Sequence, residues 1–334
     1  MRLIVTGAAG FIGMHVALAL LERGHAVTGV DTLDPYYDPR LKSDRLARLE
    51  RREGFRFERL DVADTAAFGS LVRNEAPQRV VHLAAQPGVR YSIDQPMAYV
   101  HSNLVGFASV LEACRHAGVP HLVYASSSSV YGDSPQVPFS EHDPVDHPLS
   151  LYAASKRANE LMAHVYAHLY RLPVTGLRFF TVYGPWGRPD MAPIRFARAI
   201  SEGETIRLFN YGDHQRDFTY VDDIVAGVLA VALGEPPSAG EPGGDRDPAS
   251  SDAPFRVYNI GNSRPVELME FLRVLETCLG REGRYEKVAA QPGDVHSTWA
   301  DCSDLERDYG YRPDTPLERG VADFVAWFRE YYGG

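Results

Sequence analysis

The chain has 334 residues, 45% of them hydrophobic and 23% charged, which is typical of a globular protein large enough for more than one lobe. A formal net charge of −10 argues against a surface for nucleic acids or acidic membranes. The sequence has no apolar run of membrane-spanning length, and its 3 cysteines lie too far apart to predict a disulfide framework or a zinc site. We therefore expect a cytoplasmic protein with no metal and no membrane partner.

The first 180 residues alternate between strand and helix patterns. Repeated strand–helix–strand units predict an α/β fold with a Rossmann-type, doubly wound parallel sheet. After residue 183 the alternation weakens, which indicates a smaller C-terminal α/β lobe at 181–334 with some elements returning to the first domain. The expected strands are short apolar or β-branched runs at residues 3–6, 26–30, 56–60, 80–84, 122–126 and 174–180.

Residues 234–254 form a segment rich in glycine, proline, serine and acidic side chains. Such a composition buries too little apolar surface to offset the entropy of ordering, so we predict a mobile insertion. A lid is the alternative, but the segment lacks the aromatic side chains that would anchor one.

The first predicted strand runs into a turn with glycines at Gly7, Gly10 and Gly13, followed by a helical pattern. The first glycine permits the turn, the second lets backbone approach a pyrophosphate, and the third lets the helix pack on the sheet. Asp31 ends the second strand, about twenty residues later, where a carboxylate accepts hydrogen bonds from an adenosine ribose. The same charge repels a 2′-phosphate, so NAD is favoured over NADP. The alternative role of Asp31 is a turn cap.

Further cofactor contacts are expected from the turn itself and from the ends of later strands. Asp61 can accept from the adenine amino group, and the small side chains of Ala84 and Ala85 let backbone pass close to the cofactor. A surface aspartate and a pair of packing alanines would look the same in sequence. The complete set of these candidates is Phe11, Ile12, Asp61, Val62, Leu83, Ala84 and Ala85.

Tyr152 and Lys156 form a Tyr-x-x-x-Lys pair near the start of a predicted helix, for which Ser150 is a suitable N-cap. This spacing places both side chains on one helix face, one turn apart. A phenol with a pKa of about 10 is a poor base at neutral pH. An adjacent ammonium and a cationic nicotinamide ring both favour the phenolate, which lowers the pKa of Tyr152. Lys156 can also bond the nicotinamide ribose.

A serine run ends another predicted strand 25 residues before Tyr152, and it includes Ser127. The Ser127 hydroxyl can bond the substrate hydroxyl and stabilise a developing oxyanion. Alone, a Tyr-x-x-x-Lys pair is most often a coincidence on a helix surface. Together with the glycine turn and the serine run, it predicts hydride-transfer catalysis by Ser127, Tyr152 and Lys156.

The chain resembles the extended short-chain dehydrogenases/reductases, in particular the nucleotide-sugar epimerases and dehydratases, nearly from end to end. This resemblance implies bound NAD in the domain at 1–180, a nucleoside diphosphate sugar in the lobe at 181–334, and removal of hydride from sugar C4. The segments that carry it are residues 6–13, 126–132, 152–156, 178–184 and 216–223.

Three longer stretches resemble UDP-glucuronate 4-epimerases, namely residues 31–42, 86–92 and 184–191. The dehydratases carry an Asp-Glu pair where this chain has Ser128-Ser129, and UDP-galactose 4-epimerases typically have asparagine in place of Thr181. We therefore expect epimerisation of UDP-glucuronate to UDP-galacturonate through a 4-keto intermediate. UDP-glucuronate decarboxylase is the first alternative, followed by UDP-galactose 4-epimerase and by a non-catalytic NAD-binding regulator.

Oxidation at C4 of a glucuronosyl group places a ketone β to the carboxylate, and such acids lose carbon dioxide readily. Ser128 and Thr181 can hold the carboxylate out of the alignment that permits this loss without donating a proton to the enolate. Arg188 can orient the carboxylate or contact a phosphate, and Arg90 is a further candidate. Either arginine could instead be a solvated surface charge.

The family resemblance also implies contacts to the uridine diphosphate, with Arg216 on a phosphate and Asp294 on the ribose. Helical segments around residues 104–117 and 152–170 carry more apolar positions than one sheet face needs. Family members commonly pair through these two helices, so we expect a homodimer. The alternative is packing within one chain.

Overall fold

The computed structural model describes residues 1–240, 247–289 and 297–333. Seven strands pair in parallel in one sheet, in the order β11-β6-β5-β4-β1-β2-β3. The predicted Rossmann-type α/β fold is thereby confirmed. The strands of this sheet are β1 (Arg2–Thr6), β2 (Ala26–Asp31), β3 (Phe55–Arg59), β4 (Arg79–His82), β5 (Leu122–Ser127), β6 (Val174–Phe179) and β11 (Phe255–Ile260).

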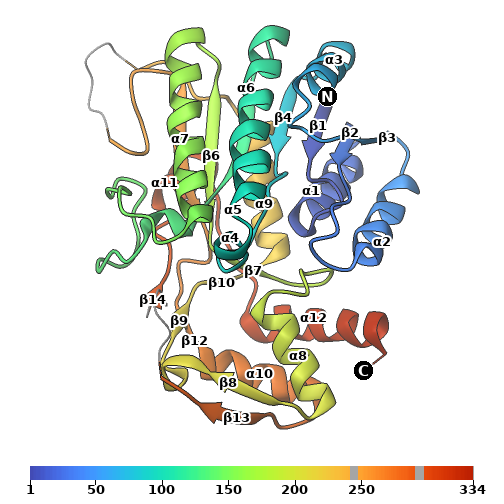
Figure 1. Ribbon diagram of the computed structural model, residues 1–334, viewed down its shortest axis with the longest axis vertical. Coiled ribbons are helices and arrows are strands. Elements are labelled where there is room, and N and C mark those ends of the chain that lie inside the picture. Colours follow the sequence, from blue (N-terminus) through green and yellow to red (C-terminus); the bar gives the residue numbers. More distant parts are fainter. Residues whose placement is uncertain (241–246, 290–296, 334) are drawn as a thin grey trace.

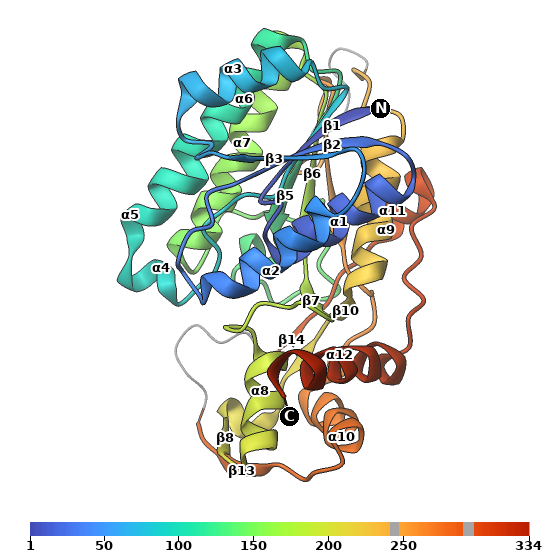
Figure 2. The ribbon, with the colours of Figure 1, turned by 90° about the vertical axis from the view of Figure 1, so that its right-hand side faces the viewer.

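Helices cover both faces of the sheet (Figure 2). Strand β1 shows why this arrangement is stable: Leu3 and Val5 lie in one apolar cluster and Ile4 in the other, so alternate side chains enter opposite layers. One layer contains α3 (Thr65–Glu75), α6 (Gly106–Ala117) and α7 (Leu151–Tyr170). The other contains α1 (Phe11–Glu22), α2 (Pro39–Glu50), α9 (Val221–Leu233) and α11 (Ser303–Tyr309).

A smaller lobe lies beyond the carboxyl ends of the strands (Figure 1). Its main elements are α8 (Ala192–Glu202), β8 (Thr205–Leu208), α10 (Leu268–Leu279), β13 (Arg284–Lys287) and α12 (Leu317–Tyr332), with β13 parallel to β8. Short strands connect the lobes: β7 (Thr181–Tyr183) pairs with β10 (Phe218–Tyr220), and β9 (Gln215–Arg216) lies between β12 (Val266–Glu267) and β14 (Ser297–Thr298).

Five short helical elements complete the described chain. They are α4 (Tyr91–Asp94), α5 (Pro96–Tyr99), the π-helix η1 (Val100–Val105), and the 3-10 helices η2 (Ser128–Tyr131) and η3 (Phe209–Gly212). The predicted division near residue 180 stays a prediction, and β11, α9 and α11 are elements from beyond it that pack with the first domain.

Two local expectations can be compared with the structure directly. Helix α7 begins at Leu151, and the Ser150 hydroxyl accepts from the Ala153 amide at 3.1 Å, so the N-cap prediction is confirmed. In the predicted insertion at 234–254, residues 241–246 lie outside the described part. Residues 247–254 are anchored to the rest of the protein, because Ala249 and Ala253 are buried and His164 bonds the Ser251 hydroxyl at 3.0 Å.

In the described part of the chain, no helix is both long and apolar enough to cross a membrane. The same residues contain no cluster of three or more His, Cys, Asp or Glu side chains suited to a metal ion. Cys114, Cys278 and Cys302 are free thiols.

Candidate active site

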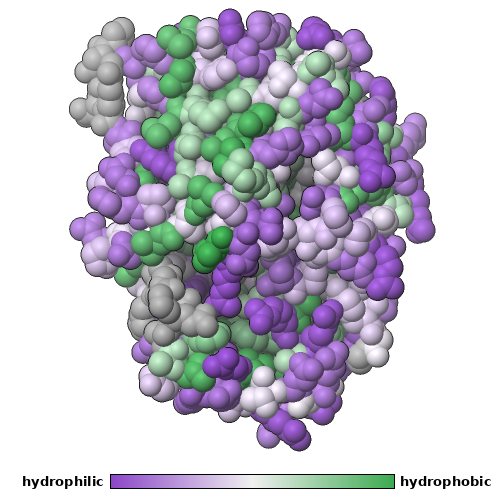
Figure 3. Space-filling model, viewed as in Figure 1, coloured by the Kyte–Doolittle hydropathy of each residue, from purple (hydrophilic) through white to green (hydrophobic). Residues whose placement is uncertain are grey.

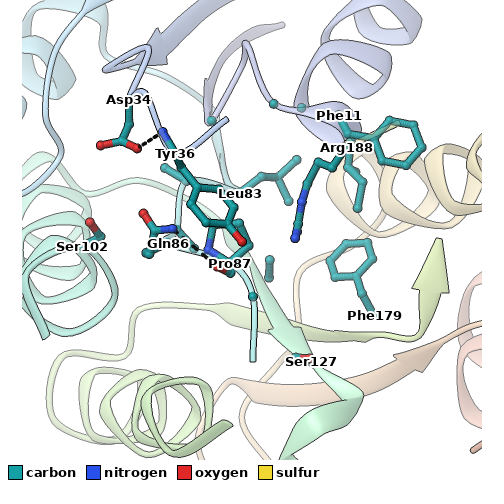
Figure 4. Close-up of a pocket in the computed structure, with 18 of the residues that line it drawn as sticks. Phe11, Asp34, Tyr36, Leu83, Gln86, Pro87, Ser102, Ser127, Phe179 and Arg188 are labelled. Atoms are coloured by element: carbon teal, nitrogen blue, oxygen red, sulfur yellow. Dashed lines mark hydrogen bonds between the residues drawn. The ribbon is translucent and has the colours of Figure 1, made fainter. Parts of the chain in front are cut away.

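A cavity of about 620 Å³ lies at the carboxyl ends of the sheet strands and extends from the glycine turn to the catalytic candidates (Figure 4). This is the edge of a doubly wound sheet at which ligands bind. It is lined by the turns that follow β1, β3 and β4, by residues of α1, β2, β5, β6 and α7, and by the first residues of the second lobe. The predicted residues among them are Gly7, Gly10, Phe11, Ile12, Gly13, Asp31, Asp61, Val62, Leu83, Ala84, Ala85, Ser127, Ser128, Tyr152, Lys156, Thr181 and Arg188.

Two predicted substrate contacts, Arg90 and Arg216, do not line this cavity, and a third falls outside the described residues. Arg90 is exposed and lies 5.6 Å from the centre of the Phe209 ring. Arg216 is half-buried on β9, where its guanidinium donates to the Gln215 carbonyl at 2.9 Å. Asp294 lies outside the described residues. Their roles stay predictions.

The glycine turn is packed too closely for side chains. Gly7 has a φ of +70°, and a Cβ there would lie 2.8 Å from the Ala84 amide nitrogen. A Cβ at Gly13 would overlap the Gly7 carbonyl oxygen, so the first turn of α1 can approach β1 only with glycine at this position. The turn therefore exposes backbone at the start of a helix, which is the arrangement that binds a pyrophosphate.

Two carboxylates flank this turn. Asp31 accepts from the Ala9 amide at 3.1 Å and from the Leu33 amide at 2.8 Å, so it braces the glycine turn as well as its own turn. Asp61 accepts from the Ala63 amide at 2.9 Å and bonds His101 at 2.9 Å. Both line the cavity. A backbone cradle with a carboxylate at the end of the second strand fits the adenosine diphosphate part of NAD.

Tyr152 and Lys156 lie at the other end of the cavity, on the first turns of α7. Burial raises the pKa of Tyr152 above its ordinary value, and the hydrogen bond with Ser127 and the positive charge of Arg188 oppose this shift without outweighing it. The described residues alone therefore do not lower this pKa as the sequence predicted. The Lys156 ammonium donates to the Ala125 carbonyl at 2.9 Å, and burial lowers its pKa to about 8. The positive charge of Arg188 therefore acts on the phenol, and the role of Lys156 stays a prediction.

A buried network holds this end of the cavity together. Glu160 lies one turn beyond Lys156 on α7, and its carboxylate forms a bidentate pair with Arg178 of β6 at 2.8 and 3.0 Å. Both side chains are fully buried. The same carboxylate accepts from the Ser126 hydroxyl at 2.6 Å. Burial raises the pKa of Glu160, but the charge and hydrogen bonds of Arg178 outweigh burial and hold the pKa below its ordinary value.

Sequence reasoning missed several residues that line the cavity or support it. Asn103 in the π-helix η1 fixes the loop at Gln86, accepting from its amide at 2.8 Å and donating to its carbonyl at 3.1 Å. Tyr36 lies within the stretch 31–42 that resembles the UDP-glucuronate enzymes, so a signal for it was present in the sequence. The missed lining residues include Asp34, Tyr36, Tyr37, Lys42, Gln86, His101, Phe179 and Met191.

The arrangement can support one kind of acid–base chemistry well. A phenol hydrogen-bonded to Ser127 can accept a proton from a hydroxyl and return it at the same place. The residues at 128 and 129 are serines, so elimination of water has no acid–base pair at these positions. Hydroxyls of Ser128 and Thr181, together with the Arg188 guanidinium, can bind an anionic group beside that reaction centre.

Comparison with known proteins gives a consistent result over the whole chain. The "Protein CapI" of Staphylococcus aureus is 51% identical over 333 residues, covering 99% of each chain. A "Probable UDP-glucuronate 4-epimerase" of Rhizobium meliloti is 45% identical over 334 residues, covering 99% of this chain and 98% of its own.

Among solved structures, the UDP-glucuronic acid 4-epimerase of Bacillus cereus, in complex with UDP-glucuronic acid and NAD, superposes with a TM-score of 0.88. It is 33% identical, and the match covers 99% of this chain and all of that one. Residues 3–261 match the NAD dependent epimerase/dehydratase family. The chain therefore belongs to the NAD-dependent epimerase/dehydratase family.

Proposed function

We propose that the protein is an NAD-dependent UDP-glucuronate 4-epimerase, which interconverts UDP-glucuronate and UDP-galacturonate through a 4-keto intermediate. The observation that carries this proposal is one cavity that joins a dinucleotide cradle, the Tyr152–Ser127 pair and the cationic Arg188. The names of the Rhizobium relative and of the Bacillus cereus enzyme support the same activity.

Tyr152 is the proposed acid–base group. As phenolate it takes the proton of the sugar 4-hydroxyl, while Ser127 bonds the same oxygen and stabilises its charge. When bound, NAD would supply the acceptor for hydride from C4 and its return to the opposite face of the sugar. Lys156 bonds the nicotinamide ribose, and Asp31 bonds the adenosine ribose. After the keto sugar turns over in the cavity, Tyr152 returns the proton.

Retention of the carboxylate is the step that separates an epimerase from a decarboxylase. The 4-keto sugar is a β-keto acid, and carbon dioxide leaves when its bond to C5 lines up with the carbonyl π system. Ser128, Thr181 and Arg188 line the same cavity and would hold the carboxylate out of that alignment. The uridine contacts of Arg216 and Asp294 remain proposals carried over from the family.

The activity itself is tested by incubating the purified protein with UDP-glucuronate and resolving the products by chromatography and mass. We expect UDP-galacturonate and no released carbon dioxide, because the cavity offers hydroxyl and guanidinium partners for the carboxylate. UDP-xylose as the main product would establish a decarboxylase instead. Turnover of UDP-galactose in preference to UDP-glucuronate would indicate the galactose enzyme, and no turnover of either would favour a regulator.

The role of Tyr152 is tested by Tyr152→Phe. Loss of the phenol should lower kcat by about 10² to 10⁴-fold, with NAD still bound, because only the proton transfer is removed. A matched control is Tyr170→Phe, which removes a phenol from the exposed far end of the same helix. A wild-type rate in Tyr152→Phe would remove this residue as the base.

We also propose that the protein is a homodimer formed through α6 and α7. Leu161, Val165 and Leu169 are 53%, 47% and 60% exposed, and their spacing of four residues places them in one stripe along α7. Figure 3 shows apolar side chains gathered over this part of the surface. An exposed apolar stripe supports an interface rather than packing within one chain. The cytoplasmic location stays a prediction from sequence.

Replacement of Leu161 and Val165 by glutamate tests the dimer. Because both side chains point to solvent in the single chain, the variant should fold and run at half the native mass in light scattering after gel filtration. A wild-type protein that already runs as a monomer, or a variant that stays dimeric, would contradict the proposed interface.

A further inference from the structure

The Arg188 guanidinium lies in the cavity, where one of its edges is hydrogen-bonded to Asp190 and another edge is free. Its Nε donates to one Asp190 oxygen at 3.1 Å, and its Nη2 donates to the other at 2.6 Å. A guanidinium has five N–H bonds, and the three that remain have no acceptor among the described residues. Figure 4 shows the end of this side chain pointing into the cavity. The free edge can therefore donate two parallel hydrogen bonds to a planar anion such as a carboxylate.

Asp190 is itself held from a different part of the chain. The Tyr36 hydroxyl donates to the Asp190 oxygen that also accepts from Arg188 Nη2, at a distance of 3.1 Å. Burial raises the pKa of Tyr36 to about 12, so this hydroxyl keeps its proton and stays a donor. The pKa of Asp190 is lowered because the Arg188 charge and hydrogen bond outweigh the effect of burial. The brace therefore consists of a neutral phenol, a carboxylate and a guanidinium.

The Tyr36 ring has little freedom to leave this position. It packs on the Tyr91 ring with centroids 4.7 Å apart. A Cβ at Gly88 would lie 2.7 Å from the Tyr36 hydroxyl oxygen, so the glycine leaves room for the phenol. Gly88 also has a φ of +100°. Tyr36 therefore packs against the segment that contains Gly88 and Tyr91, and this contact limits the movement of its ring.

The loop that carries Arg188 is anchored to the cofactor side as well. The buried Arg45 of α2 donates to the Gly187 carbonyl at 3.0 Å and to the Ala9 carbonyl in the glycine turn at 3.2 Å. Arg188 also lies near enough to Tyr152 for its charge to lower the pKa of that phenol. Both residues line the same cavity, so the guanidinium lies at its reacting end, where the proposed function puts the sugar ring.

We propose that Tyr36 and Asp190 are positioning residues that fix the Arg188 guanidinium for the carboxylate of the sugar and so select a uronate over a neutral hexose. This inference rests on the proposed function. Without the brace, Arg188 keeps its charge but loses the orientation that a bidentate contact requires.

The test is Tyr36→Phe, which keeps the ring and removes only the hydroxyl that reaches Asp190. Calorimetry on the NAD-loaded protein would give the Kd for UDP-glucuronate and for UDP-glucose, which differ only in the group on C5. We expect the Kd for UDP-glucuronate to rise by about tenfold, as for loss of a charge-assisted hydrogen bond, and the Kd for UDP-glucose to change less than about twofold. The KM for UDP-glucuronate should rise by a similar factor, and kcat should stay nearly unchanged.

Two further variants separate positioning from a general loss of structure. Tyr91→Phe removes a hydroxyl from the same aromatic cluster without touching Asp190, and both Kd values should stay at the wild-type level. In a background that already carries Arg188→Lys, Tyr36→Phe should change the Kd for UDP-glucuronate by less than about twofold, because the guanidinium that Tyr36 helps to orient is already absent. Equal weakening of both ligands by Tyr36→Phe, or full additivity with Arg188→Lys, would overturn the inference.

Failure here is distinguishable from failure of the proposed function. The proposed function fails when the wild-type protein makes a product other than UDP-galacturonate from UDP-glucuronate. The positioning role is read from binding to the loaded protein, so its outcome does not depend on which product forms.

Discussion

The buried pair between Glu160 and Arg178 is the interaction on which the reaction centre depends. It joins α7, which carries Tyr152 and Lys156, to β6, which lies beside the edge strand β11 of the sheet. The same carboxylate holds Ser126, the neighbour of Ser127. Since an unpaired buried charge is costly, about 3 to 5 kcal/mol when one partner is removed, the geometry of the pair fixes how the helix meets the strand. The phenol and the serine hydroxyl are therefore placed by one buried contact.

A second set of contacts connects the nucleotide end of the cavity to the sugar end. Asp31 braces the Ala9 amide, and Arg45 binds the Ala9 carbonyl together with the carbonyl of Gly187. The loop after β7 that carries Arg188 is therefore held against the same turn that forms the dinucleotide cradle. When a ligand binds at the nucleotide end, the sugar end of the cavity is already arranged. This arrangement lowers the entropy cost of orienting a large nucleotide sugar.

The sequence predicted those parts of the site that are encoded locally. Glycines at Gly7 and Gly13, a carboxylate at Asp31 and the spacing of Tyr152 and Lys156 follow from the requirements of one turn, one strand end and one helix face. All of these residues line the cavity. The fold could also be predicted from local patterns, because short apolar runs with helical segments between them permit few arrangements other than a parallel sheet.

What sequence could not provide is contact between distant segments. Tyr36 and Asp190 are 154 residues apart, and nothing in the spacing of either shows that they meet. The sequence named Lys156 as the cation near Tyr152, and the folded chain adds the charge of Arg188 from a distant loop while Lys156 also donates to a backbone carbonyl. Arg90 belongs to a segment that resembles the family, and it lies exposed near the Phe209 ring, so its role stays a prediction.

The central claim is that the buried pair positions the reacting groups rather than merely stabilising the fold. The most direct measurement is kcat and thermal stability for the double variant Glu160→Leu with Arg178→Met. Replacing both charges by apolar side chains leaves neither member of the pair as an unpaired buried charge. The Ser126 hydroxyl and the Arg157 guanidinium lose the Glu160 carboxylate as an acceptor, so the melting temperature should fall only modestly. We predict that kcat falls by about 10² while NAD binding is retained, since small displacements of reacting groups cost that much. A double variant that is folded and turns over at the wild-type rate would contradict the account.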